Sequence, residues 1–92
     1  MEPRPNLQEL LQFPCDYLFK AFGPNEPAGL FADRVQVAVS RVLPLSRDAM
    51  RVRPSGQDTY VCVTAVVRLE NFEQMSAIYA ELRKVEGLRY LL

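Results

Sequence analysis

The sequence predicts a small α+β fold in which a four-stranded antiparallel sheet carries two helices on one face. Three observations support this prediction. Apolar residues alternate along 59–69, the longest β-branched run in the chain, as expected for a strand with one buried face. Two segments, 27–43 and 71–87, repeat apolar residues every three or four positions, which is the period of an amphipathic helix. The elements follow the order strand, helix, strand, strand, helix, strand.

The first predicted strand covers 15–22 and ends at Gly23-Pro24-Asn25, because glycine and proline interrupt regular structure. The first helix is expected to begin at Glu26-Pro27-Ala28, where proline suits the first turn, and to end at Pro44. A strand over 35–39 also fits the local alternation, but the helical period extends over more residues. The predicted apolar stripe of this helix comprises Leu30, Phe31, Val35, Ala38, Val39, Val42 and Leu43.

The rest of the chain is predicted to form two strands, a second helix and a last strand. A strand over 48–54 carries two arginines and ends in proline, which is typical of a sheet edge, and a turn over 55–58 leads into the central strand 59–69. Asn71 is the expected N-cap of the second helix, and Gly87 its C-terminal glycine. A short strand over 88–92 follows. The second apolar stripe comprises Phe72, Met75, Tyr79, Leu82 and Val85.

Right-handed crossovers allow both halves to interleave into one antiparallel sheet in the spatial order 4-1-3-2. This is the ferredoxin-like βαββαβ sandwich. It places the most apolar strands in the centre and the arginine-bearing strand at an edge. The 92 residues suffice for one domain with one core, which we expect over 13–92 after a tail formed by 1–12.

Composition narrows the function classes. Eleven basic and eleven acidic residues cancel, so the chain has no overall positive field to attract nucleic acid, which argues against a nucleic-acid partner. The start lacks the apolar core of a signal peptide, and no run reaches the roughly 18 to 20 apolar residues that span a membrane; a cytoplasmic protein is expected. The chain has no histidine, and Cys15 and Cys62 are expected to be reduced and near opposite ends of neighbouring strands. We therefore expect no metal, no cofactor and no enzymatic activity.

Several short stretches occur together in a recognisable order: Leu10-Leu11-Gln12-Phe13-Pro14-Cys15 followed by Lys20 and Gly23, then Arg53-Pro54-Ser55, Tyr60, and Tyr79-Ala80-Glu81-Leu82. Through them the chain resembles, from about residue 7 to 92, the YbeD-like bacterial proteins, a family of unknown function. It departs from the usual pattern at 56–59, where a lysine and a glycine commonly precede the tyrosine. The resemblance implies an ACT-like fold, and hence a regulatory module that binds amino acids or other small effectors.

The first candidate site is the loop between the first strand and the first helix. The resemblance implies that an effector meets backbone groups there, and Glu26-Pro27-Ala28-Gly29-Leu30 is loosely similar to the proline-glycine-x-leucine signature of ACT domains. Glycine allows close approach to the backbone, and a helix start favours a carboxylate. The alternative is a plain turn that needs glycine for its own conformation. The candidate ligand-binding residues are Gly23, Pro24, Asn25 and Gly29.

The second candidate site is the uncovered face of the sheet. Its basic residues and one aromatic suggest RNA binding by stacking and phosphate contacts, although an ordinary solvated face with cross-strand pairs fits the zero net charge better. The residues concerned are Lys20, Arg51, Arg53, Tyr60, Arg68 and Arg89.

An apolar patch of Leu18, Phe22, Cys62 and Val66 would interrupt that basic face. Such a patch marks a surface for another protein or for a second copy in a homodimer; alternatively, the N-terminal Leu7, Leu10 and Leu11 cover it. Taking the basic residues and the apolar patch together, the candidate interaction residues on the uncovered face are Leu18, Lys20, Tyr60, Cys62 and Arg68. The sequence thus favours a non-enzymatic, ACT-like regulatory or binding module that acts through a small effector or a protein partner, with RNA binding as the alternative.

Overall fold

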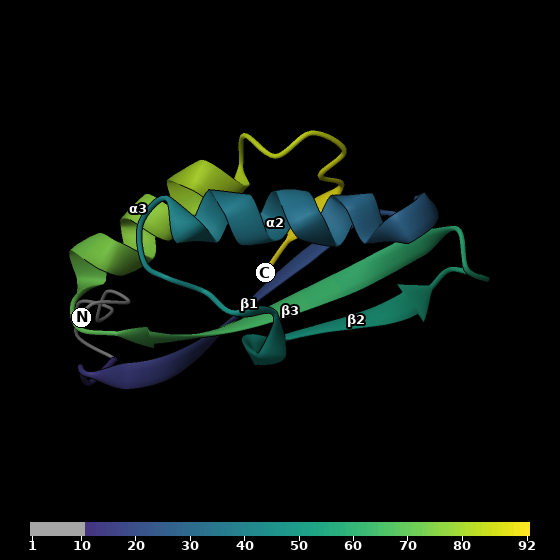
Figure 1. The fold of residues 1–92 in the computed structure, drawn as a ribbon. Coiled ribbons are helices and arrows are strands. Elements are labelled where there is room, and N and C mark those ends of the chain that lie inside the picture. The colour runs from purple at the N-terminus through teal and green to yellow at the C-terminus, as the bar shows by residue number, and fades with distance from the viewer. Residues whose placement is uncertain (1–10) are drawn as a thin grey trace, which may run out of the picture.

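The computed structural model describes residues 11–92. Four antiparallel strands form one sheet in the order β2-β3-β1-β4: β1 (Cys15–Pro24), β2 (Met50–Ser55), β3 (Tyr60–Leu69) and β4 (Tyr90–Leu91). Helices α2 (Leu30–Ser40) and α3 (Phe72–Leu82) cover one face of it (Figure 1). The predicted order 4-1-3-2 is the same arrangement counted from the other edge, so the ferredoxin-like prediction is confirmed.

The central strands pair along their whole length. β1 and β3 run antiparallel from Cys15 opposite Leu69 to Pro24 opposite Tyr60. Because side chains alternate between the two faces of a strand, the odd-numbered residues of both strands share the face beneath the helices. The odd-numbered positions of β3, from Val61 to Leu69, are all 6% exposed or less. The alternation that predicted the central strand is thereby confirmed.

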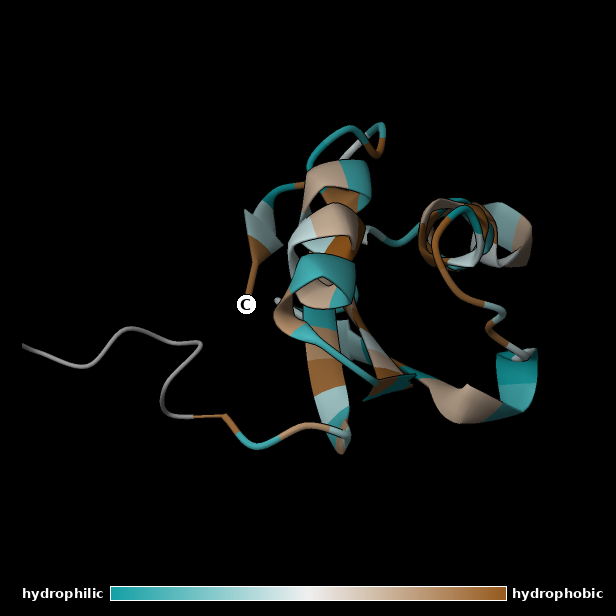
Figure 2. Ribbon diagram, turned by 90° about the vertical axis from the view of Figure 1, so that its left-hand side faces the viewer, coloured by the Kyte–Doolittle hydropathy of each residue, from teal (hydrophilic) through white to brown (hydrophobic). Residues whose placement is uncertain are grey.

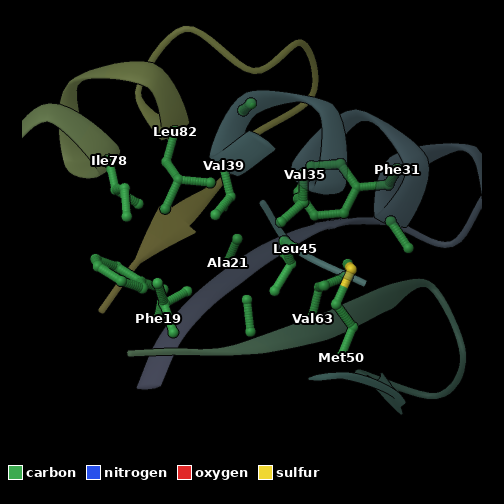
Figure 3. Packing of buried hydrophobic residues seen from close by; sticks show 14 of the residues in the cluster. Phe19, Ala21, Phe31, Val35, Val39, Leu45, Met50, Val63, Ile78 and Leu82 are labelled. Carbon is green, nitrogen blue, oxygen red and sulfur yellow. The ribbon is translucent and has the colours of Figure 1, made fainter. Parts of the chain in front are cut away.

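Both helices close the core from above the sheet. Seen after a quarter turn, they lie side by side over it (Figure 2), and their apolar side chains meet those of the strands (Figure 3). Ala32 and Ile78 lie outside the predicted stripes yet are buried, whereas Leu30 was expected on a stripe and is 46% exposed. Leu30 is exposed because the buried face of α2 centres on Phe31, Val35, Ala38 and Val39.

The predicted start of the first helix is wrong. Pro27–Gly29 forms a short 3-10 turn, η1, in which Ala28 has a φ of 60°. Gly29 follows with a φ of 68°, so two successive residues take the left-handed conformation that a right-handed helix excludes. The α-helix therefore begins at Leu30.

Other element ends also differ from the predictions. A second 3-10 turn, η2 (Arg47–Ala49), delays β2 until Met50. The second helix ends at Leu82, and Gly87, with a φ of 88°, lies in the turn that follows. The predicted cap at Asn71 is confirmed, since its side chain accepts a hydrogen bond of 2.9 Å from the backbone N–H of Gln74.

The last strand is short but firmly attached. Within β4, Tyr90 lies opposite Phe22. Backbone hydrogen bonds continue on either side: the Arg89 N–H donates to the Phe22 carbonyl at 2.7 Å, and the Leu92 N–H donates to the Lys20 carbonyl at 2.8 Å. The chain after α3 is thus held against β1 by more than its two strand residues.

The cysteines lie as expected. Both Cys15 and Cys62 are free thiols. Cys15 lies opposite Leu69, whereas Cys62 lies opposite Phe22, seven pairs further along the ladder. The two side chains point to opposite faces of the sheet, because one has an odd and the other an even position in the register.

Candidate functional site

Several predicted site residues gather on the face of the sheet away from the helices, the lower side in Figure 1. Leu18 lies opposite Val66, Lys20 opposite Thr64 and Phe22 opposite Cys62, and residues directly opposite in a ladder share a face. We call this surface the open face. Its strand residues are Asp16, Leu18, Lys20, Phe22, Pro24, Arg51, Arg53, Ser55, Tyr60, Cys62, Thr64, Val66, Arg68 and Tyr90.

The predicted apolar patch is present on the open face. Leu18 is 51% exposed and its cross-strand partner Val66 is 39% exposed. Phe22 and Cys62 form a second pair further along the sheet and are half-buried. Two exposed aliphatic side chains that lie directly opposite each other form a small apolar patch in the middle of this face.

The open face is positively charged, although the chain as a whole is neutral. Lys20, Arg51 and Arg53 are exposed there, and no carboxylate of the described residues pairs with them. The Arg68 guanidinium forms an ion pair with the Asp16 carboxylate at 3.5 Å, and Asp16 is the single acidic residue among the strand positions of this face. Carboxylates on or beside the helix layer include Glu26, Asp33, Glu73, Glu81 and Glu86.

A small cavity occupies the end of the open face next to the turn between β2 and β3. It measures about 350 Å³ and is lined by Phe22, Ser55, Tyr60, Arg89 and Tyr90. The Arg89 guanidinium lies 4.8 Å from the centre of the Tyr60 ring, and the rings of Phe22 and Tyr90 meet edge to face at 6.0 Å. We call this cavity the sheet-end pocket. Ser55 and Tyr90 were not among the sequence candidates.

The loop predicted to bind an effector is tightly engaged with its own chain. Gly23 is buried against the ring of Phe31, where a Cβ atom would overlap three ring carbons. The Asn25 N–H donates to the Thr59 carbonyl at 3.1 Å, and its side-chain amide donates to the Asp58 carbonyl at 2.8 Å. These contacts account for a glycine at position 23 without a ligand, and the effector site stays a prediction.

Of the other two predicted residues, Pro24 is the last residue of β1 and Gly29 is the last residue of η1. Pro24 closes β1 opposite Tyr60, and the Gly29 N–H donates to the Glu26 carbonyl at 3.4 Å. Arg34 on α2 pairs with the Glu26 carboxylate and donates through Nε to the Glu86 carbonyl at 3.1 Å. One guanidinium therefore connects this loop with the turn that leads to β4.

Part of the N-terminal covering alternative lies outside the described residues. Leu7 and Leu10 belong to the range 1–10, which the structure does not describe. Leu11 is half-buried and packs, with Phe13, against the core cluster beneath the helices.

A groove of about 300 Å³ between the helices is a further concave feature. Its apolar lining includes Leu30 and Val37, which are 46% and 53% exposed. The Arg41–Glu81 ion pair, at 3.3 Å, spans it. Because that pair joins α2 to α3, the groove is an internal seam of the helix layer as well as a surface.

The strongest electrostatic perturbation lies at Tyr79. Its hydroxyl is 2.8 Å from that of Tyr17, and burial, followed by this hydrogen bond, raises the pKa of Tyr79 above its usual value. The group therefore keeps its proton. Among residues 11–92, no three potential ligands from histidine, cysteine, aspartate and glutamate gather as a metal site, and no helix is long and apolar enough to cross a membrane.

Comparison with known proteins assigns the chain to a family. The model of the family described as "Protein of unknown function (DUF493)" matches residues 8–92. The chain belongs to this family. It is 33% identical over 92 residues to a UPF0250 protein of Pasteurella multocida, covering 98% of this chain and 99% of the relative. A UPF0250 protein of Edwardsiella ictaluri is also 33% identical, over 86 residues that cover 94% of this chain and 95% of that one. The YbeD-like resemblance is thus confirmed.

The fold has a solved counterpart. The ACT domain from the GTP pyrophosphokinase of Chlorobium tepidum superimposes with a TM-score of 0.56 at 16% sequence identity, covering 85% of this chain and 97% of that domain. At this identity the likeness concerns the fold alone. The ACT-like architecture implied by the resemblance is confirmed.

Proposed function

We propose that this member of the DUF493 family is a non-enzymatic, ACT-like regulatory module that docks a protein partner on its open face. The segment that it binds carries acidic side chains around aliphatic ones. The observation that carries the proposal is the exposed Leu18–Val66 pair among cations that no described carboxylate neutralises.

The aliphatic pair supplies the driving force for association. Leu18 is 51% exposed and Val66 is 39% exposed. Complete burial of a leucine or valine side chain is worth about 1.5–3 kcal/mol, so covering the exposed part of each contributes roughly 1 kcal/mol. Such a patch is small, and docking therefore depends on additional contacts around it.

The cations select the partner. Lys20 stands next to Leu18 on the same face, two residues along β1, and Arg51 lies opposite Thr64, the partner of Lys20. Charge complementarity across an interface mainly speeds encounter and excludes wrong partners. A segment with alternating glutamate and leucine presents both chemistries at the spacing of a strand. A second copy of this chain would instead bring cations against cations in a face-to-face pair.

A protein partner fits this face better than RNA. Sheet-faced RNA modules stack bases on exposed aromatic rings in the middle of the sheet. Here aliphatic side chains and Thr64 occupy the middle, and the Tyr60 ring at one end is covered on one side by Arg89. The rings of Phe22 and Tyr90 contact each other.

A fluorescein-labelled ten-residue peptide of alternating glutamate and leucine tests the proposal by fluorescence anisotropy. We expect saturable binding that weakens with salt and that falls at least about fivefold in Leu18→Gln and Val66→Gln, roughly 1 kcal/mol each. Val52→Gln is the matched control, because Val52 is 44% exposed but lies opposite Val63 on the covered face; its affinity should stay within about twofold. Equal losses in all three variants, or tighter binding of a peptide with lysines for glutamates, would contradict the proposal.

A further inference from the structure

We propose that the sheet-end pocket is a second binding site, which takes a carboxylate attached to a flat apolar group. This inference goes beyond protein docking at the Leu18–Val66 pair and does not depend on it. The pocket holds about 350 Å³, which is at the lower end of the range of small-molecule sites, about 300–1,000 Å³. Its five lining residues supply three aromatic rings, one guanidinium and three hydroxyls, one from Ser55 and two from the tyrosines, and none of the five is a carboxylate.

Arg89 supplies the anion-binding group. Its guanidinium lies over the Tyr60 ring at 4.8 Å, and no carboxylate of the described residues pairs with it. The Arg89 backbone is anchored by the 2.7 Å hydrogen bond to the Phe22 carbonyl. A guanidinium stacked on a ring keeps the N–H groups at its edge available, and this edge matches the two oxygens of a carboxylate.

The aromatic rings select the rest of the ligand. Phe22 and Tyr90 meet edge to face with an interplanar angle of 66°, and Tyr90 is 60% exposed, so a flat group can cover it and gain apolar burial. Ser55 lies opposite Tyr60 on the neighbouring strand, and its hydroxyl can donate to a ligand oxygen or accept from a ligand N–H. A neutral ligand would use the rings but leave Arg89 without an acceptor.

Because of where the pocket lies, a bound ligand should stabilise the attachment of β4 to the sheet. The lining residues come from β1, from β2, from β3 and from the segment that forms β4. β4 has only two residues, and a ligand held by Arg89 and Tyr90 would fasten it to the central strands. Binding should therefore slow hydrogen exchange of the Leu92 N–H, which donates to Lys20, because any ligand specific to the folded arrangement stabilises it.

N-acetyl-phenylalanine, titrated into the isotope-labelled full chain, is the probe, and its carboxamide is the charge control. We expect saturable NMR shifts at the rings of Phe22, Tyr60 and Tyr90 with the acid, and at least tenfold weaker binding of the amide. Arg89→Gln should weaken the acid roughly tenfold or more, the range of a charge-assisted hydrogen bond. Arg53→Gln is the matched control, since Arg53 shares the open face but does not line the pocket; it should change affinity by less than about threefold.

Two further arms identify the source of the carboxylate. A peptide ending in phenylalanine with a free carboxyl terminus, compared with its amidated form, distinguishes a chain end from a free small acid, and Arg89→Lys keeps the charge but removes the two-pronged geometry. Equal binding of acid and amide, or equal losses in Arg89→Gln and Arg53→Gln, would overturn the pocket proposal. Docking of the glutamate-leucine peptide should remain intact in Arg89→Gln, so failure of one proposal is distinguishable from failure of the other.

Discussion

Replacing Gly23 with alanine tests whether this glycine is required by internal packing. The added Cβ would lie 2.5 Å from Cδ1 of the Phe31 ring and closer still to two further ring carbons, whereas non-bonded carbon atoms normally approach to about 3.5–4.0 Å. The Gly23 backbone is not in the left-handed region, so the strain arises from the contact alone.

The expected cost follows from how little Phe31 can move. Its side chain is 1% exposed, and overpacking a closed core costs about 1–3 kcal/mol. With three ring carbons in overlap, we expect Gly23→Ala to lower the free energy of unfolding by about 3 kcal/mol. A domain of this size has roughly 5–10 kcal/mol of stability, so the variant should still fold.

Urea unfolding followed by far-UV circular dichroism measures this loss, since the chain has four tyrosines but no tryptophan. Phe31→Leu should itself cost about 1–2 kcal/mol. In that background Gly23→Ala should cost less than about 1 kcal/mol, because the overlapping ring carbons are gone; the two sites are then coupled by roughly 2 kcal/mol. An equal cost in both backgrounds, or a neutral single variant, would refute the packing explanation and favour a ligand-related role for Gly23.

Three other changes test local features. Asn71→Ala should lower stability by about 1 kcal/mol, measured by the same unfolding, because the cap on the Gln74 N–H is lost; Asn71→Asp should retain most of it. Tyr79→Phe should cost about 1 kcal/mol by leaving Tyr17 without its partner, and the double variant Tyr17→Phe/Tyr79→Phe should cost less than the sum of the two single changes. The raised pKa of Tyr79 implies that stability is retained below about pH 10, where an unfolded tyrosine ionises, and falls as the pH rises further; Tyr79→Phe should flatten this alkaline slope, and an unchanged slope would contradict it. Gln57→Gly should raise stability by about 0.5–1 kcal/mol, because Gln57 has a φ of 56°; a loss in the unfolding assay would refute this.

The architecture could be predicted from the sequence because apolar residues recur at a clear strand period in β3 and at a clear helical period in both helices. The alternation from Val61 to Leu69 predicted which face of β3 is covered. The arginines of the second strand predicted that it lies at an edge of the sheet, and the order β2-β3-β1-β4 confirms this. The element ends were less accessible. Pro27 suits a helix start, yet Ala28 and Gly29 adopt the left-handed conformation, which residue preferences at these two positions do not predict.

The candidate sites could be predicted only where they depend on which side chains of neighbouring strands share a face of the sheet. Leu18 and Val66 were grouped correctly because both belong to long strands with clear alternation. The contact between Gly23 and Phe31 depends on how α2 crosses β1, which no local pattern records. The sheet-end pocket likewise needs residues of all four strand segments, with Ser55 and Tyr90 contributed from strands that two others separate.

The most direct test of the central claim is a nitrogen-proton NMR titration of the labelled full chain at two salt concentrations. The glutamate-leucine peptide, a pool of amino acids and a short RNA are added in separate experiments. The account predicts that the peptide shifts the signals of Leu18, Lys20 and Val66 in a salt-sensitive way. If instead an amino acid shifts Gly23, Asn25 and Gly29 while the peptide has no effect, or if only the RNA shifts the open face, docking of an acidic protein segment is the wrong function.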